Sequence, residues 1–310
     1  MAANKLTGVL LVGFGGPRSL DEVAPMLQAV MGFNPPVPVV ASAKRKYEAI
    51  GGSSPIVPIA QEISEQLEVA LRAAGSEAEY VHPGMCFTAP RIAEGLACLA
   101  GEGCERVIFL SMTPYESWAA WGLPLQMVRE AAAEVGITEV LATPAFGLFE
   151  PYLSGHMTTI RRVMTDVADP ALVFVAHSLP LDDELEDPLK YENQLREACD
   201  SIASAVGVEH ALLAFTSVGA RGGQWLGPNL SEVLNTVAAA GTKRVVVCPL
   251  GFATDHMEVL YDLDLAARAE AEALGLDFVR TPTLATAEAV NPALIEAMAT
   301  SVTIALEEDE

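Results

Sequence analysis

Cysteine, basic residues and long apolar runs are all scarce in this chain of 310 residues. Its five cysteines are scattered and form no C-x-x-C pair, which argues against a disulfide framework, a structural zinc site and an iron–sulfur cluster. Lys and Arg number 18 against 41 Asp and Glu, and the formal net charge of −23 excludes nucleic acid as a partner. No stretch approaches the roughly 20 apolar residues of a membrane-spanning helix, and no signal-peptide pattern opens the chain. We therefore predict a cytoplasmic protein.

Short β-branched runs alternate with amphipathic helical stretches. The runs cover residues 8–14, 78–84, 106–112, 171–177, 211–217 and 244–250. Strands that are apolar throughout are covered on both faces, which predicts parallel sheets of the α/β class. The alternation occurs twice, on either side of a helix expected at residues 149–170. We predict two similar Rossmann-like, doubly wound halves around a central cleft, residues 1–150 and 151–310, with the C-terminal helix a candidate to pack on the first half.

The first strand is followed by the glycine-rich stretch GFGGPRS. It is not a dinucleotide-binding fingerprint, because Arg18 stands where the third glycine would be and Pro17 interrupts the entry to the helix. The glycines allow the backbone to approach a flat or anionic ligand closely, and Arg18 is available to a carboxylate. A plain strand-to-helix turn explains the stretch equally well.

The stretch AHSLP places His177 at the end of another strand. Ligands of open parallel sheets bind beyond the carboxyl ends of the strands, so this position faces the expected crevice. A lone histidine among apolar residues is more often a satisfied core residue than a catalyst. At a strand end, however, it suits a proton acceptor that works near neutral pH.

The stretch GFATDHMEVLYDLD follows the last run and is unusually acidic. Glu258 and Asp262 are four residues apart and share one helical face, with Asp255 and His256 at the start of that helix. Carboxylates at this spacing repel one another, so the fold gains nothing from them. They can hold a divalent metal or move protons, although they lack the ligand set of a permanent site. We predict a transient metal station opposite a base; a solvated acidic face is the alternative.

Several stretches together resemble one known family, the ferrochelatases, and in particular the compact soluble bacterial type that uses coproporphyrin. They are, in chain order, GFGGP, YEAIGGSSPI, AHSLP, YENQLREA, QWLGPN and GFATDHMEVLYDLD. The resemblance covers nearly the whole chain. It implies two Rossmann-like halves around a deep cleft and the insertion of Fe2+ into a porphyrin to give haem, with distortion of the ring and removal of its N–H protons.

The resemblance also implies roles for individual residues. His177 accepts a pyrrole proton or helps to deliver the metal, and Glu258 faces it across the porphyrin. His177, Glu258 and Asp262 are the implied contacts of the metal, whereas Asp255 and His256 orient the site. The expected substrate-binding residues are Phe14, Arg18, Tyr115, Trp118, Trp121 and Ser178. For Trp118 and Trp121, stacking on the macrocycle and packing within the fold stay equal alternatives.

Three departures from the family pattern bear on the substrate. Phe14 stands where many coproporphyrin-using members have a tyrosine, and a phenylalanine cannot ligate iron. Residues 30–40 are apolar where those members tend to carry basic side chains. Ala266 ends the acidic ridge, so a metal relay would stop at Asp262 or use Asp264. The first two departures make a less carboxylated porphyrin more credible.

On balance we expect a monomeric ferrochelatase that uses coproporphyrin III. Its Fe2+ is a substrate, and we expect neither a permanently bound cofactor nor an iron–sulfur cluster. The alternatives are a protoporphyrin IX ferrochelatase, a cobalt or nickel chelatase of another tetrapyrrole, and a non-catalytic haem- or porphyrin-binding protein. Retention of both His177 and Glu258 argues against the last of these, because a carrier needs neither base.

Overall fold

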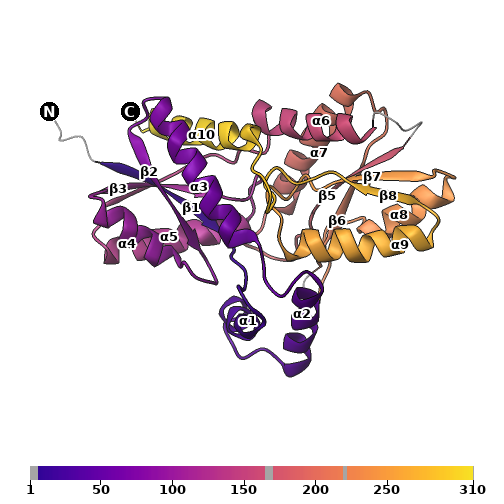
Figure 1. The fold of residues 1–310 in the computed structure, drawn as a ribbon, viewed down its shortest axis with the longest axis horizontal. Helices are drawn as coiled ribbons and strands as arrows, with labels where there is room; N and C mark the ends of the chain where they lie inside the picture. The colour runs from indigo at the N-terminus through magenta and orange to yellow at the C-terminus, as the bar shows by residue number, and fades with distance from the viewer. Residues whose placement is uncertain (1–5, 165–169, 219–221, 310) are drawn as a thin grey trace.

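A computed structural model describes residues 6–164, 170–218 and 222–309. These residues form two four-stranded sheets, side by side in Figure 1. The first sheet contains β1 (Thr7–Gly13), β2 (Ala78–Met85), β3 (Arg106–Ser111) and β4 (Glu139–Ala142). The second contains β5 (Ala171–His177), β6 (Leu212–Thr216), β7 (Arg244–Cys248) and β8 (Asp277–Arg280). All pairings are parallel, and the predicted α/β class with two similar sheets is confirmed.

The two sheets have the same strand order. It is β2-β1-β3-β4 in the first sheet and β6-β5-β7-β8 in the second. The order reverses between β1 and β3, and again between β5 and β7. Ligands of open parallel sheets bind at such reversals, beyond the carboxyl ends of the two strands. The topology therefore directs attention to the segments that follow β1, β3, β5 and β7.

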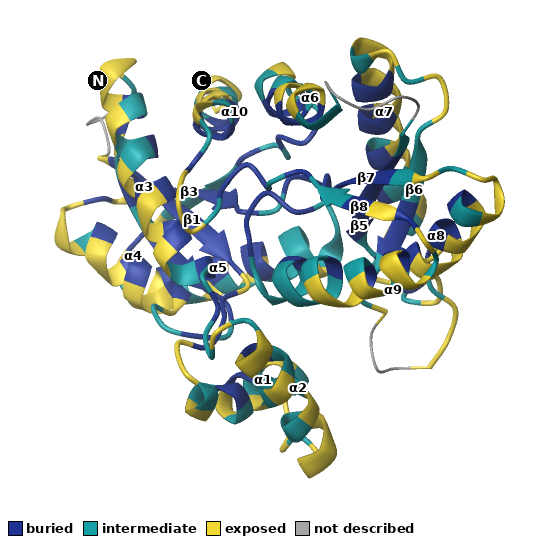
Figure 2. Cartoon of the chain, turned by 45° about the vertical axis from the view of Figure 1, so that its right-hand side comes forward, coloured by how far each residue is buried: buried dark blue, intermediate teal, exposed yellow. Residues whose placement is uncertain are grey.

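The described residues also form α-helices, most of which cover the sheets. They are α1 (Val23–Met31), α2 (Val37–Ala49), α3 (Ile56–Ala73), α4 (Ile92–Gly101), α5 (Leu123–Glu134), α6 (Glu150–Met164), α7 (Pro188–Val206), α8 (Leu230–Ala239), α9 (Arg268–Ala273) and α10 (Pro292–Glu307). A 3-10 turn η1 (Leu20–Glu22) and two π-helices, η2 (Trp118–Gly122) and η3 (Glu258–Ala267), complete the elements. Figure 2 shows mostly buried strands between helices whose exposed residues face outward, whereas α1 and α2 are exposed over most of their surface. Strands covered on both sides explain the uninterrupted apolar runs of the sequence.

Helices α1 and α2 form a hairpin that projects from the two-sheet body (Figures 1 and 2). A small cluster holds it together, in which Val23 and Met26 of α1 pack on Tyr47 of α2. Met257, just before η3, packs against the same cluster. The hairpin thereby joins the first half of the chain to the acidic stretch of the second half.

Helix α10 returns to the first sheet at the end of the chain. It packs against α3, β3 and β4 as well as against α6, so that the C-terminus lies above the first sheet (Figure 1). Leu294, Met298 and Val302 of α10 are buried in the main core, which extends over elements of both sheets. The division of the chain near residue 150 stays a prediction.

The sequence patterns missed one strand in each sheet. These strands are β4 and β8, which lie at sheet edges and have only four residues each. A four-residue edge strand need not be apolar throughout, so it has no long β-branched run. Helix α6 is described to Met164; the last part of the helix expected at residues 149–170 lies outside the described residues.

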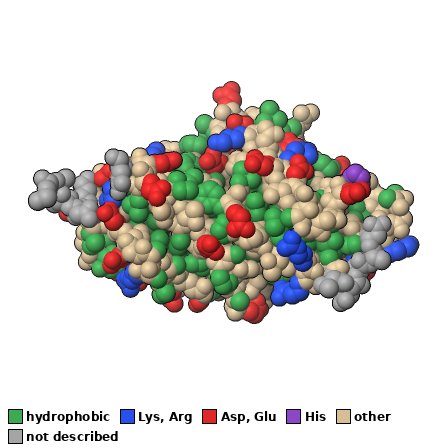
Figure 3. Space-filling view, turned by 90° about the horizontal axis from the view of Figure 1, so that it is seen from above, with side chains coloured by type: hydrophobic (Ala, Val, Ile, Leu, Met, Phe, Trp, Pro, Cys, Tyr) green, Lys and Arg blue, Asp and Glu red, His purple; other side chains and the backbone are tan. Residues whose placement is uncertain are grey.

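The surface carries the excess of acidic side chains that the composition requires. In Figure 3 carboxylates are spread over the face that is seen, with apolar side chains between them. No helix in the described part of the chain is long and apolar enough to cross a membrane. The cytoplasmic location and the monomeric state stay predictions.

Candidate active site

His177 is the last residue of β5, at the reversal of strand order in the second sheet. Its Nδ1 lies 2.6 Å from the carbonyl oxygen of Ser178. A carbonyl oxygen only accepts, so Nδ1 carries a hydrogen and Nε2 is the atom that faces the site. The side chain is 39% exposed, and the imidazole is therefore accessible as well as fixed in orientation.

Glu258 lies between two histidines. Its Oε1 is 3.6 Å from Nε2 of His177, and its Oε2 is 3.6 Å from Nε2 of His256. Nδ1 of His256 lies 3.0 Å from the carbonyl oxygen of Thr254, which turns Nε2 of this ring toward the carboxylate too. The side chain of Glu258 is 23% exposed. Two neutral imidazoles would both present lone pairs to the carboxylate, so the arrangement favours a proton on at least one ring.

The charges of the pair follow from their contact. Burial alone would lower the pKa of His177, but the Glu258 carboxylate raises it to about 9. Burial alone would raise the pKa of Glu258, and the His177 imidazolium holds it well below its usual range. At neutral pH the resting site therefore contains an imidazolium, which holds the proton, and an ionised carboxylate.

The acidic helix differs from the predicted one in type and in starting point. It is the π-helix η3, which begins at Glu258, so Asp255 and His256 precede the helix instead of opening it. π-helical turns are rare in proteins overall, and those that occur are often found at functional sites. Asp262 is still on the same helix as Glu258, and its negative charge also raises the pKa of His177. Glu258 and Asp262 therefore share one helix, as expected, but the helix is of the π type.

Asp262 makes two polar contacts. Its Oδ1 lies 2.8 Å from Nζ of Lys46 on α2, and its Oδ2 accepts a hydrogen bond of 3.2 Å from Oγ of Ser217. A pocket of about 350 Å³ opens beside it, and Glu270 also lines this pocket. Within the described residues no group of three or more His, Cys, Asp or Glu side chains is gathered as for a metal ion. The metal role of Asp262 stays a prediction.

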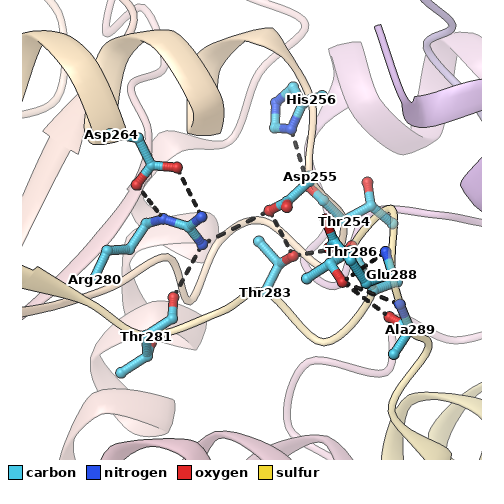
Figure 4. Close-up of polar contacts among 11 residues, drawn as sticks. Thr254, Asp255, His256, Asp264, Arg280, Thr281, Thr283, Thr286, Glu288 and Ala289 are labelled. Atoms are coloured by element: carbon cyan, nitrogen blue, oxygen red, sulfur yellow. Dashed lines mark hydrogen bonds and ion pairs between the residues drawn. The ribbon is translucent and has the colours of Figure 1, made fainter. Parts of the chain in front are cut away.

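Asp255 anchors the segment in front of η3 (Figure 4). Its Oδ1 accepts a hydrogen bond of 2.8 Å from Oγ1 of Thr283 and lies 3.7 Å from Nη1 of Arg280. Arg280 in turn donates to both oxygens of Asp264, at 2.6 and 2.8 Å. Asp264 is thus committed to a structural bidentate pair, which leaves it unsuited to a metal relay. Burial raises the pKa of Asp255, and Arg280 opposes that shift.

Two tyrosines near Glu258 were missed by the sequence reasoning. Tyr47 of α2 and Tyr191 of α7 are both buried, and burial together with the charge of Glu258 raises the pKa of each. The hydroxyl of Tyr191 donates to the carbonyl oxygen of His177 at 3.2 Å. Both tyrosines open stretches that support the family resemblance, YEAIGGSSPI and YENQLREA, and this was the available signal.

Phe14 and Arg18 follow β1, at the reversal of strand order in the first sheet. The ring of Phe14 is 48% exposed and lies 4.6 Å from that of Phe87 between centroids, so it presents an apolar surface. Arg18 is bound by Glu22, with 2.8 Å between Nη2 and Oε1. A substrate carboxylate would have to replace Glu22 before it could contact this guanidinium.

The two tryptophans after β3 differ in their surroundings. Trp121 packs edge-on against Phe109, with 5.6 Å between the ring centroids, and its buried indole N–H has no hydrogen-bond partner among the described residues. These contacts favour packing over stacking for Trp121. The ring of Trp118 folds back over Gly122, where a Cβ atom would lie 2.3 Å from it. Trp118 is half-buried at the start of η2.

Tyr115 and Ser178 are not placed as substrate contacts. Tyr115 is buried, and its hydroxyl donates to the carbonyl oxygen of Gly147 at 3.3 Å. Ser178 is also buried, and its hydroxyl donates to the carbonyl oxygen of Leu226 at 2.8 Å. Neither hydroxyl is free for a substrate, because both are buried and satisfied, and the substrate-binding roles of the two residues stay predictions. Strand-end position alone does not tell which way a side chain points.

Comparison with known proteins gives a consistent result. Residues 6–305 match the family model described as ferrochelatase. A curated protein named ferrochelatase from Herpetosiphon aurantiacus is 30% identical over 305 residues, which cover 96% of this chain and 98% of that protein. A coproporphyrin III ferrochelatase from Mycobacterium avium is 30% identical over 286 residues, covering 89% of this chain and 82% of the relative.

A solved structure shares the fold. SirB from Bacillus subtilis with Fe3+ superposes with a TM-score of 0.61 at 12% sequence identity, over 96% of this chain and 95% of that one. At such low identity the likeness concerns the fold alone. It agrees with the two parallel sheets and their shared strand order.

Proposed function

The chain belongs to the ferrochelatase family, and we propose that it inserts Fe2+ into coproporphyrin III, with His177 and Glu258 as the proton-handling pair. Membership makes it a metal chelatase of the lyase class, with a porphyrin and Fe2+ as substrates. The observation that carries the proposal is the 3.6 Å contact between His177 and Glu258, which brings the segments after β5 and β7 together where the strand order reverses.

Metal insertion requires two pyrrole N–H protons to leave the ring. The Glu258 carboxylate is ionised at rest, and it can accept a proton once His177 has lost its own, because the imidazolium is what holds its pKa low. His177 holds a proton at rest and must release it before it can accept the second. Its exposed imidazole allows that release to solvent, and an approaching divalent cation favours it by like-charge repulsion.

His256 and Asp255 act on this pair from behind. His256 contacts the second oxygen of Glu258, and Asp255 fixes the backbone next to it through Thr283 and Arg280. We assign both residues to orienting the carboxylate, as the family resemblance implies. Positioned groups of this kind reduce the motion needed at the moment of proton transfer.

The choice of porphyrin has support on both sides. The Mycobacterium avium relative is named for coproporphyrin III, and α2 carries Lys44 and Arg45, whose charges suit the four carboxylates of that ring. In contrast, Phe14 and Phe33 are 48% and 57% exposed and suit an apolar ring edge. Protoporphyrin IX, with two carboxylates, is therefore the second candidate.

Parallel steady-state assays test the proposal. Anaerobic rates of Fe2+ insertion are measured with coproporphyrin III and with protoporphyrin IX, and then with Co2+ and Ni2+ in place of Fe2+. We expect the highest kcat/KM for Fe2+ with coproporphyrin III. A higher kcat/KM with protoporphyrin IX would reverse the choice of substrate. Porphyrin binding without insertion of any of these metals would indicate a non-catalytic porphyrin-binding protein.

A further inference from the structure

A polar connection joins the tryptophan segment (residues 115–122), in the first half of the chain, to the segment that follows His177. The carboxylate of Glu186 accepts two backbone hydrogen bonds, 2.7 Å from the N–H of Trp118 and 2.9 Å from the N–H of Ala119. Glu186 lies between β5 and α7, so one side chain reaches from the segment behind the catalytic histidine to the start of η2. Each of its oxygens holds one N–H group.

A second carboxylate makes the reciprocal contact. Glu116, on the tryptophan segment, forms an ion pair with Lys190 in the first turn of α7. The backbone N–H of Glu116 also donates to Oε1 of Gln194, at 3.5 Å. We call Glu116, Trp118, Glu186 and Lys190 the clasp, since each half contributes one carboxylate that is bound by the other half.

The clasp is connected to the catalytic histidine by two tyrosines. Tyr115, next to Glu116, packs edge-on against Tyr191, with 6.5 Å between the ring centroids. Tyr191, next to Lys190, donates its hydroxyl to the carbonyl oxygen of His177. Burial raises the pKa of Tyr191, and the charges of Glu258 and Glu186 add to that shift, so this residue lies between the site and the clasp.

Stability alone does not account for the clasp. The side chains of Lys190 and Glu116 are 56% and 32% exposed, and ion pairs this accessible contribute little to folding. Helix α7 and the tryptophan segment are already held by buried apolar contacts of Tyr115, Tyr191 and Leu195 in the main core. What the polar contacts add is a fixed distance between the segment after β3 and the segment after β5, two strands that each lie beside a reversal of strand order.

We propose that Glu186 and Lys190 are positioning residues that seat the porphyrin. They hold the Trp118 segment at a set distance from His177, so that the tetrapyrrole meets both segments together. The inference rests on the proposed function, because it assigns the Trp118 segment to the porphyrin side of the site. Loss of the clasp is expected to weaken the seating of the ring and not the handling of the metal.

The test compares two carboxylates of the same segment. Glu186→Ala removes both bonds to η2, whereas Glu184→Ala removes an exposed carboxylate for which the described residues offer neither a hydrogen bond nor an ion pair. We expect Glu186→Ala to raise the KM for porphyrin, and its Kd from quenching of tryptophan fluorescence, about tenfold. We expect the KM for Fe2+ to stay within twofold, and Glu184→Ala to match the unmodified protein. A purely structural role would lower kcat and melting temperature and leave the porphyrin KM unchanged.

A charge exchange provides an independent test. Lys190→Glu places two carboxylates together and should raise the porphyrin KM at least as much as Glu186→Ala. Adding Glu116→Lys restores an ion pair of opposite polarity and should bring the KM back to within threefold. Equal porphyrin constants for Glu186→Ala and Glu184→Ala, or no recovery in the exchanged pair, would overturn the inference. Failure of the unmodified protein to insert any metal would instead refute the proposed function, and the porphyrin Kd values would still test the clasp.

Discussion

Lys46 on α2 and Asp262 on η3 form an ion pair, with 2.8 Å between Nζ and Oδ1. The same ammonium group lies 5.1 Å from the ring centroid of Tyr261. The helical hairpin is thereby bound to the helix that carries Glu258. If Asp262 contacts the metal during delivery, as the sequence suggests, then Lys46 competes with the metal for this carboxylate.

Removal of the Lys46 ammonium group is expected to strengthen the binding of Fe2+ during delivery. Lys46→Met frees Oδ1 of Asp262 and keeps the hydrogen bond from Ser217. A partly exposed pair of this kind is worth up to about 1 kcal/mol, which corresponds to about fivefold in affinity. We expect the KM for Fe2+ to fall by about that factor in steady-state assays. Lys243→Met, which removes an exposed lysine just before β7, is the control, and equal iron constants in the two variants would remove Asp262 from the metal path.

Substitutions at the central pair should separate turnover from binding. His177→Ala and Glu258→Gln each remove one proton acceptor, and the loss of a positioned acid or base costs ~10²–10⁴ in rate. We expect insertion to be abolished while the porphyrin Kd stays within about tenfold, measured by fluorescence titration. Full activity in either variant would contradict the proton-handling assignment.

The importance of His177 and Glu258 was predictable, because His177 ends an apolar strand and Glu258 lies in the distinctive acidic stretch that follows another. Their neighbours were less so. Arg280 binds Asp255 from β8, a four-residue edge strand without an apolar run, and no local pattern marks it. The π-helical form of η3 was also hidden, since i, i+4 spacing of Glu258 and Asp262 is equally consistent with an α-helix. The contact between Glu186 and Trp118 links residues 68 positions apart, and only the packed chain brings them together.

Purified protein should show no iron–sulfur absorption. Four of the five cysteines, Cys86, Cys104, Cys199 and Cys248, are buried, and burial raises the pKa of their thiols, to about 11 for Cys104 and about 12 for Cys86. Thiolates are the ligands of such clusters, and within the described residues no three or more His, Cys, Asp or Glu side chains are gathered as for a metal ion. The visible spectrum of anaerobically purified, porphyrin-free protein checks this. A stoichiometric cluster would show that the cysteines are arranged differently.

Arg280 is expected to matter for stability much more than an exposed arginine on the neighbouring strand. Arg280→Met takes the guanidinium away from the buried Asp255 and from Asp264, and breaking a buried pair costs ~3–5 kcal/mol. Arg244→Met removes the exposed pair with Asp277 between β7 and β8, which is worth at most about 1 kcal/mol. Urea unfolding monitored by circular dichroism compares the two. Similar losses in free energy of unfolding would mean that Arg280 does not anchor the segment before η3.

The contact of His177 with Glu258 also makes stability depend on pH in a defined direction. The pKa of His177 is raised from 6.5 to about 9 in the folded protein, so the folded state binds this proton more tightly than the unfolded chain. The resulting stabilisation is complete below pH 6.5 and is lost as the pH rises through about 9. Because the imidazole is 39% exposed, solvent screening limits the effect to about 1 kcal/mol. The unmodified protein should therefore have a higher free energy of unfolding than Glu258→Gln at about pH 6, and this difference should shrink by that amount by about pH 10. Glu184→Gln is the control, and its free energy of unfolding should change with pH as that of the unmodified protein does. The same pH dependence in Glu258→Gln would show that His177 and Glu258 do not interact.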